Sequence, residues 1–122
     1  MFKYYLAQSY LGTLAKMEHR HMVGCRCAAW LMAQGHTVYA PIPHGHAIAN
    51  LAEPPLPRGA VFWWKQNKAA MDSSEQLAVL VTDCWEKSTG LTQEQAYAKA
   101  CSMKIRRIEY LDGKFSWMDD ST

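Results

Sequence analysis

The sequence has little net charge of either sign. The chain has 13 Lys and Arg residues and 11 Asp and Glu residues, which gives a formal net charge of +2 over 122 residues. Proteins that bind nucleic acid through its phosphates need a basic stripe, and a chain this close to neutrality does not supply one. We therefore expect no nucleic acid polymer among its partners.

Cysteines are few, and none shows the CxxC spacing of a redox or zinc motif. The four are Cys25, Cys27, Cys84 and Cys101. A chain of this length can build a hydrophobic core without disulfides, so reduced thiols are expected. Residues 1–7 hold too short an apolar run for a signal peptide. Together these features favour a cytoplasmic location.

Charged side chains are absent from residues 27–52. Gly35, Pro41 and Pro43 interrupt this stretch, so it does not predict a membrane span, and we expect no membrane partner. The stretch instead predicts the end of a helix, a strand stopped by the prolines, and a loop that contains His44 and His46.

Predicted strands and helices alternate along the chain. The apolar run 77–81 is typical of a strand buried on both faces of a parallel sheet. We expect one α/β domain over residues 1–122, built as a three-layer α/β/α, doubly wound parallel sheet of Rossmann-like or flavodoxin-like type. The predicted strands are 4–7, 37–40, 77–81 and 105–111. The predicted helices are 17–34, 62–74 and about 89–101. We also expect a surface excursion over 47–61 and a polar tail from about 112.

The segment that follows the buried strand is the first candidate for chemistry. Ser88, Thr89 and Gly90 precede a helix that Thr89 or Thr92 can cap, and backbone N–H groups there can hold a phosphate. Glu94 is then expected in the first helical turn, where the helix dipole favours the ionised carboxylate that a nucleophile requires. The alternative is an acidic residue that only stabilises the helix N-terminus.

Histidines and tryptophans supply further candidates. His44 and His46 follow the second strand, at the edge of the sheet where ligands bind, whereas His19 and His21 are expected at the surface. No carboxylate or thiolate lies beside them at a recurrent ligand spacing, so we expect no metal and no cofactor. Trp85 is the best candidate for stacking on a nucleobase, although tryptophans more often fill cores.

Three segments together resemble the nucleoside 2-deoxyribosyltransferase superfamily, in particular a branch of small phage and bacterial proteins. They are YYLAQSY at the start, AAWLMAQGHTVYAP in the middle and DCWEKSTGLTQEQAYAKA near the end, and the resemblance covers about residues 4–111. The family's opening strand and YLA-type turn, whose aromatic residue faces the sugar, are matched by Tyr5, Leu6, Ala7 and Tyr10. Its block of helix, Gly-His, strand and Pro is matched by Gly35, His36 and Pro41. Its most specific pattern, WxxSxGxxxE, is matched by Trp85, Ser88, Gly90 and Glu94.

The resemblance implies cleavage or transfer at the N-glycosidic bond of a nucleoside or nucleotide. Glu94 would attack the anomeric carbon, and the loop Ser88–Gly90 would hold the sugar or its 5′-phosphate. The partner would be a small molecule. A homodimer or higher homo-oligomer is implied because family sites are often completed by a neighbouring subunit. A phage-encoded chain would act in the host cytoplasm.

The sequence departs from the family pattern at one catalytic position. Family members carry an Asp, eight residues ahead of the first acidic position of the third strand, that helps to protonate the departing base. Aligning Glu75 with that position places Asn67 there, and an amide cannot deliver a proton. One alternative is that Asp72 takes over. A second is a leaving group that departs without an acid, such as nicotinamide in an NAD-type glycohydrolase. A third is that the chain is a non-catalytic nucleotide-binding or sequestering protein.

Overall fold

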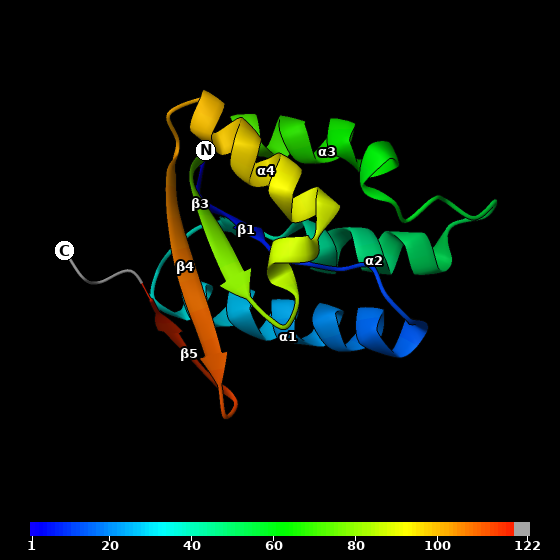
Figure 1. Cartoon of the computed structure of the whole chain (residues 1–122), viewed down its shortest axis with the longest axis horizontal. Coiled ribbons are helices and arrows are strands. Elements are labelled where there is room, and N and C mark those ends of the chain that lie inside the picture. Colours follow the sequence, from blue (N-terminus) through cyan, green and yellow to red (C-terminus); the bar gives the residue numbers. More distant parts are fainter. Residues whose placement is uncertain (119–122) are drawn as a thin grey trace.

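A computed structural model describes residues 1–118, which form a single α/β domain. Within these residues a five-stranded sheet is combined with four α-helices and one short 3-10 helix (Figure 1). The strands are β1 (Phe2–Ala7), β2 (Val38–Tyr39), β3 (Ser74–Val81), β4 (Lys104–Leu111) and β5 (Lys114–Trp117). The helices are α1 (Leu14–Ala33), α2 (Pro41–Leu51), α3 (Ala60–Asp72), α4 (Thr89–Ala100) and the 3-10 helix η1 (Trp85–Lys87).

The strands are arranged in the order β2-β1-β3-β4-β5. The pairs β1–β2, β1–β3 and β3–β4 are parallel, with Tyr5 opposite Leu77 and Leu77 opposite Ile105. The predicted parallel pairing of the first four strands is therefore confirmed. Because parallel strands end at the same edge of a sheet, the segments that follow β1, β2 and β3 are brought together there.

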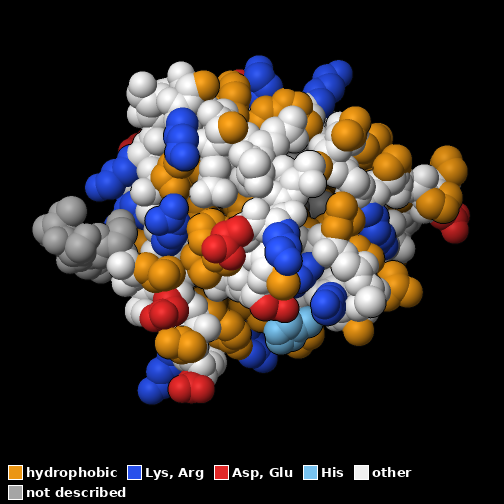
Figure 2. Space-filling view, viewed as in Figure 1, with side chains coloured by type: hydrophobic (Ala, Val, Ile, Leu, Met, Phe, Trp, Pro, Cys, Tyr) orange, Lys and Arg blue, Asp and Glu red, His pale blue; other side chains and the backbone are white. Residues whose placement is uncertain are grey.

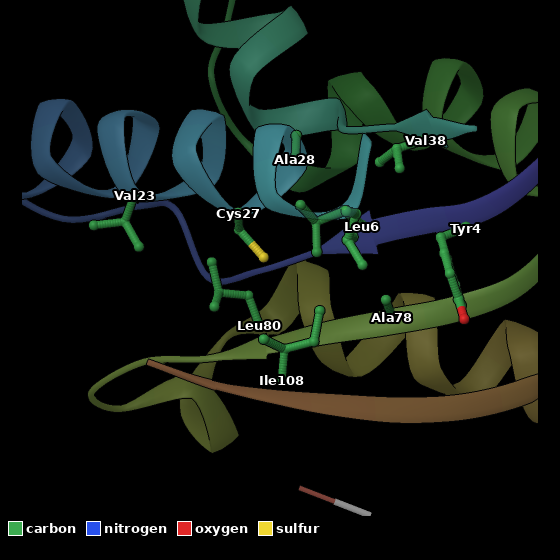
Figure 3. Close-up of a cluster of buried hydrophobic side chains, with 10 residues drawn as sticks. Tyr4, Leu6, Val23, Cys27, Ala28, Val38, Ala78, Leu80 and Ile108 are labelled. Carbon is green, nitrogen blue, oxygen red and sulfur yellow. The ribbon is translucent and has the colours of Figure 1, made fainter. Parts of the chain in front are cut away.

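The central strand β3 is the most deeply buried element. Leu77, Ala78, Val79 and Leu80 are all completely buried, as the apolar run predicted. On one face, side chains of β1, β3 and β4 pack against Val23, Cys27 and Leu31 of α1 (Figure 3). On the other face, Tyr5, Ala7, Leu77 and Val79 pack against Met71 of α3 and against Leu91 and Ala98 of α4. Both faces of the sheet are thus covered by helices.

The chain end differs from the predicted polar tail. Residues 114–117 form β5, which pairs antiparallel with β4 and places Lys114 opposite Leu111. Asp112 and Gly113 make the turn and both have positive φ, at 51° and 75°, which is the geometry that an Asp-Gly pair favours in a two-residue hairpin. The remainder of the predicted tail, residues 119–122, lies outside the described residues.

A second correction concerns the segment that follows β2. His44, Gly45 and His46 lie in helix α2 rather than in a loop, and α2 takes up the first part of the predicted excursion. Pro41 occupies the first helical position, where its missing N–H leaves no hydrogen bond unmade and its fixed φ suits the helix. The proline that ends the strand therefore also begins a helix.

The surface mixes charges of both signs. Figure 2 shows Lys and Arg side chains spread over one face of the molecule, with Asp and Glu side chains between them. Within residues 1–118, no helix combines the length and apolar character needed to cross a membrane.

Candidate functional site

A cavity open to solvent, with a volume of about 70 Å³, lies at the carboxyl edge of the parallel strands. Its apolar lining includes Leu11, Ile42, Ala49 and Trp63, and its polar lining consists of Gln8, Tyr10, His46, Arg58, Asn67, Ser88 and Glu94. The residues come from the segment after β1, from α2, from the loop before α3, from α3 itself and from the start of α4, so the cavity exists only in the folded chain.

Three helices begin at the cavity. Pro41 and Ile42 of α2, Ala60 of α3, and Gly90 of α4 with its cap Ser88 all line it. Each helix N-terminus presents the positive end of the helix dipole, and α3 and α4 also present backbone N–H groups, whereas Pro41 and Pro43 leave α2 with only that of Ile42. The arrangement therefore favours a ligand with negative charge. Ser88, not Thr89 or Thr92, is the cap of α4, because its hydroxyl accepts a hydrogen bond from the Leu91 N–H at 3.2 Å.

Glu94 is the acidic group of this cavity. Among the described residues that line it, no other carboxylate is present. The Glu94 side chain is only 5% exposed and accepts a hydrogen bond from the hydroxyl of Tyr5, a completely buried residue of β1. Burial raises the pKa of Glu94 to about 7, although the hydrogen bond from Tyr5 acts in the opposite direction. Near neutral pH the carboxyl group is thus divided between its ionised and protonated forms.

The predicted position of Glu94 in the first helical turn is wrong. The first turn of α4 contains no acidic residue, and Glu94 follows one turn later on the face of the helix that packs against the sheet. The helix dipole weakens beyond the first turn, whereas removal from water acts on the whole carboxylate. Desolvation therefore sets the charge of Glu94.

A chain of hydrogen-bonding side chains begins at the cavity lining and continues beyond it. The Tyr10 hydroxyl lies 2.6 Å from Nδ1 of His46, and Nε2 of His46 lies 2.8 Å from Oε2 of Glu18. Arg58 donates from Nη1 to the Tyr10 hydroxyl oxygen at 2.7 Å. Arg58 also donates to the side chain of Asn50. These bonds tie α1, α2 and the loop before α3 to the segment after β1.

Two buried polar residues hold the segment that carries Tyr10. Nη1 of Arg20, on α1, donates to the carbonyls of Tyr10 and Leu11 at 3.2 and 2.7 Å. Gln8 donates from Nε2 to the Arg20 carbonyl at 2.9 Å and is itself only 3% exposed. These hydrogen bonds therefore fix the Tyr10 backbone to α1.

Asn67 lies on α3 and lines the same cavity as Glu94. Asp72 does not replace the missing acid, because it is exposed at the end of α3, accepts a hydrogen bond from Tyr97 and lies 4.0 Å from Lys68. The proposal that Asp72 takes over is contradicted by this position.

The structure brings six of the residues predicted for the site together at the cavity, namely Tyr10, His46, Asn67, Ser88, Gly90 and Glu94. Tyr5 lies behind Glu94 as its hydrogen-bond donor.

Four other predicted residues lie away from the cavity. Ala7 is completely buried in the hydrophobic core, and Thr89 is exposed. His44 is exposed with its ring 5.5 Å from that of Tyr39. Trp85 is half-buried, packs against the core beside α4 and does not line the cavity.

Sequence reasoning missed Arg58 and Gln8 and did not select Trp63. Arg58 lies in the connection between α2 and α3, just before Gly59, and no local pattern marks that connection as part of a site. Gln8 directly follows the first buried strand, and that position is the signal that could have placed it at the carboxyl edge of the sheet. The described residues contain no group of three or more His, Cys, Asp or Glu side chains that could hold a metal ion.

Residues 3–110 match a protein family described as "Domain of unknown function (DUF1937)". The match covers most of the chain, from β1 to the end of β4, and the chain therefore belongs to this family. No curated protein matches the sequence.

Proposed function

We propose that this protein cleaves or transfers the N-glycosidic bond of a nucleoside or nucleotide, with Glu94 as the nucleophile. The observation that supports this function best is a single buried carboxylate, held by a tyrosine hydroxyl, in a cavity that three helix N-termini line. The resemblance of WxxSxGxxxE to the nucleoside 2-deoxyribosyltransferase superfamily adds to it. The enzyme would be an N-glycosidase or a deoxyribosyltransferase, depending on whether water or a second base accepts the sugar.

In the proposed reaction, one oxygen of ionised Glu94 attacks the anomeric carbon of the sugar. The bond from that carbon to the base nitrogen breaks, and its electron pair leaves with the base. In the second step the glycosyl ester is broken, and the Glu94 carboxylate is the leaving group. The hydrogen bond from Tyr5 then stabilises the carboxylate as it leaves. The pKa of about 7 for Glu94 suits the first step, because the ionised group is a stronger nucleophile than an exposed carboxylate and part of it is still ionised near neutrality.

A substrate phosphate has a matching place in this scheme. The segment Ser88, Thr89 and Gly90 begins α4 at the cavity, and the starts of α2 and α3 add their dipoles. We assign the 5′-phosphate of a nucleotide to this region. Arg58 contributes the guanidinium among the lining residues and adds to the positive potential.

The finer architecture and the assembly belong to the same proposal. The order β2-β1-β3-β4 is the flavodoxin-like order of a doubly wound sheet, and helices cover both faces, which supports a three-layer α/β/α arrangement. We further propose a cytoplasmic homodimer or larger homo-oligomer, as the family resemblance implies.

Asn67 favours a second candidate function. An amide beside Glu94, where the related enzymes carry an acid, would suit a nucleotide-binding protein without turnover, or a glycohydrolase whose leaving group departs neutral, such as nicotinamide from NAD. The nucleotide-binding protein would release no base, and the glycohydrolase would release nicotinamide.

Release of free base from pooled nucleosides, nucleoside monophosphates and NAD, followed by chromatography, tests the proposal. Glu94→Gln should abolish turnover and leave the dissociation constant within about tenfold of the wild-type value, because it removes the covalent step and little ground-state binding. Glu86→Gln, at an exposed glutamate of η1, is the matched control and should retain activity. Undiminished base release by Glu94→Gln would exclude Glu94 as the nucleophile.

A further inference from the structure

The side-chain chain from Glu18 to Tyr10 connects solvent to the cavity. Glu18 is 57% exposed at its outer end, and His46 in the middle is only 6% exposed. Tyr10 lines the cavity at the inner end. Glu18 comes from α1 and His46 from α2, so two helices and the segment after β1 meet to form this connection.

The chemistry of the partners fixes the direction of two of these hydrogen bonds. An ionised carboxylate only accepts, so the 2.8 Å contact with Glu18 places a proton on Nε2 of His46. A guanidinium only donates, so the Tyr10 oxygen is the acceptor of the 2.7 Å bond from Arg58. When Nδ1 of His46 also carries a proton, the Tyr10 oxygen accepts a second bond, and the phenolic proton is left to point into the cavity.

The groups around His46 differ in what they offer its two ring nitrogens. The Glu18 carboxylate lies against Nε2 and Tyr10 lies against Nδ1, whereas the Asn50 amide nitrogen lies 3.2 Å from Nε2 and the cationic Arg58 donates to both Tyr10 and Asn50. The ring of His21 is stacked on His46 at 4.3 Å between ring centroids. Burial, and then the charge of His46, lower the pKa of His21, so His21 is neutral near pH 7 and does not oppose a charge on His46.

We propose that Tyr10 is the proton donor to the departing base, that His46 resupplies its proton, and that Glu18 holds the second proton of His46. This inference rests on the proposed glycosidic chemistry. As the bond between the anomeric carbon and the base breaks, the phenolic proton moves to a ring nitrogen of the base. The Nδ1 proton of His46 moves to the Tyr10 oxygen, which restores the phenol and leaves neutral His46 with its remaining proton on Nε2, against Glu18. After the products leave, a solvent proton adds to the Tyr10 oxygen from the open cavity, and the phenol passes a proton back to Nδ1.

This relay accounts for the amide at Asn67. Glu94 is occupied as the nucleophile, Asn67 cannot deliver a proton, and Asp72 lies outside the cavity. Arg58 stabilises the negative charge that develops on the Tyr10 oxygen while its proton leaves. Tyr10 is the catalytic residue in this scheme, and His46 and Glu18 are positioning residues that act through it.

The test compares two substrates that differ only in the need for a proton. 2′-Deoxyguanosine 5′-monophosphate releases an anionic base unless it is protonated, whereas its N7-methylated form already carries a positive charge and releases a neutral base. Tyr10→Phe should lower kcat for the first substrate about 100-fold and change kcat for the second by less than about threefold, with KM little changed for both. Tyr97→Phe, which removes a hydroxyl bonded to Asp72 outside the cavity, should affect neither.

The same two substrates test His46. His46→Gln removes the proton that restores Tyr10, so it should lower kcat for the unmethylated substrate and change kcat for the methylated one by less than about threefold. Circular dichroism and thermal unfolding of each variant check that it folds, and Glu18→Gln, at the exposed end, provides a milder second variant.

The outcomes separate the relay from the proposed function. Equal slowing of both substrates by Tyr10→Phe, or no slowing of either, overturns the relay while glycosidic cleavage by the wild type stands. Equal kcat for the unmethylated substrate in the wild type and in His46→Gln also overturns it. If the wild-type protein releases base from neither substrate, the proposed function fails, and the relay fails with it.

Discussion

At the scale of single residues, the local environment decides the chemistry of Glu94. Its carboxyl group is removed from water and holds one hydrogen bond, from Tyr5. The same glutamate on the exposed face of α4 would be an ordinary surface anion. Asn67 shares the cavity and differs from the expected aspartate only by an amide in place of a carboxyl group, yet that exchange removes a proton donor.

Asn67→Asp should restore a proton donor where the relay has been broken. In the Tyr10→Phe background we expect it to raise cleavage of 2′-deoxyguanosine 5′-monophosphate by about tenfold or more, within the range of positioned acid catalysis. Burial and the nearby Glu94 charge would raise the pKa of the new carboxyl group, which keeps it protonated near neutrality. With Tyr10 intact, the gain should be small. Single-turnover base release measures both effects. An equal gain in the two backgrounds would contradict the inference that Tyr10 supplies the proton to the base.

At the scale of elements, the packing of α1 against the end of β1 sets the geometry of the cavity. Gly24 of α1 lies so close to Gln8 that a Cβ atom there would be 2.0 Å from the Gln8 Oε1 atom. Gln8 in turn bonds to the Arg20 carbonyl, and Arg20 holds the carbonyls of Tyr10 and Leu11. A glycine in the middle of a helix therefore permits the contact that fixes a cavity wall.

Gly24→Ala should destabilise the protein although alanine is the better helix former. We expect the free energy of unfolding to fall by about 1 kcal/mol, because overpacking at Gln8 outweighs the gain in helix propensity of about 1 kcal/mol. In a Gln8→Ala background, where the obstructing side chain is absent, the same substitution should be neutral or stabilising. Urea unfolding of the four proteins completes the cycle, and a loss that persists without the Gln8 side chain would show that the clash lies elsewhere.

At the scale of the whole molecule, the fold places a buried carboxylate where it opposes stability. The parallel sheet brings the starts of α2, α3 and α4 to one edge, and α4 carries Glu94 against the sheet behind that edge. Natural proteins commonly hold such unfavourable groups at functional sites at the expense of folding free energy. The position of Glu94 agrees with that pattern.

Stability should therefore depend on pH through Glu94. Its pKa is about 7 in the folded protein and 4.5 in the unfolded chain, so the folded state binds the proton more tightly. The stabilisation is fully present below pH 4.5 and is lost as pH rises through 7, a change of roughly 3 kcal/mol. Glu94→Gln cannot ionise, so the difference in unfolding free energy between wild type and this variant should shift by that amount between pH 4 and pH 8. A pH-independent difference would contradict a buried, titrating Glu94.

Local sequence patterns were sufficient for most of the secondary structure. The apolar run of β3 predicted a strand buried on both faces, and alternating strands and helices predicted a parallel sheet, because both patterns reflect burial along the chain itself. The Asp112–Gly113 hairpin was instead predicted as a polar tail, although an Asp-Gly pair is a local signal for a two-residue turn. The start of α2 at Pro41 was less decidable, since the same proline can end a strand or begin a helix.

What only the tertiary structure decided is which side chains meet. Tyr5 and Glu94 are 89 positions apart, Tyr10 and Arg58 are 48 apart, and Glu18 and His46 are 28 apart. No local pattern encodes such contacts, because they depend on how helices cross the sheet and on which strands are neighbours. The sequence by itself determined that Glu94 would follow a Ser-Gly segment after a buried strand. Its burial, which overrides the helix dipole, and the connection of Tyr10 to solvent through His46 both follow from packing between elements distant in the chain.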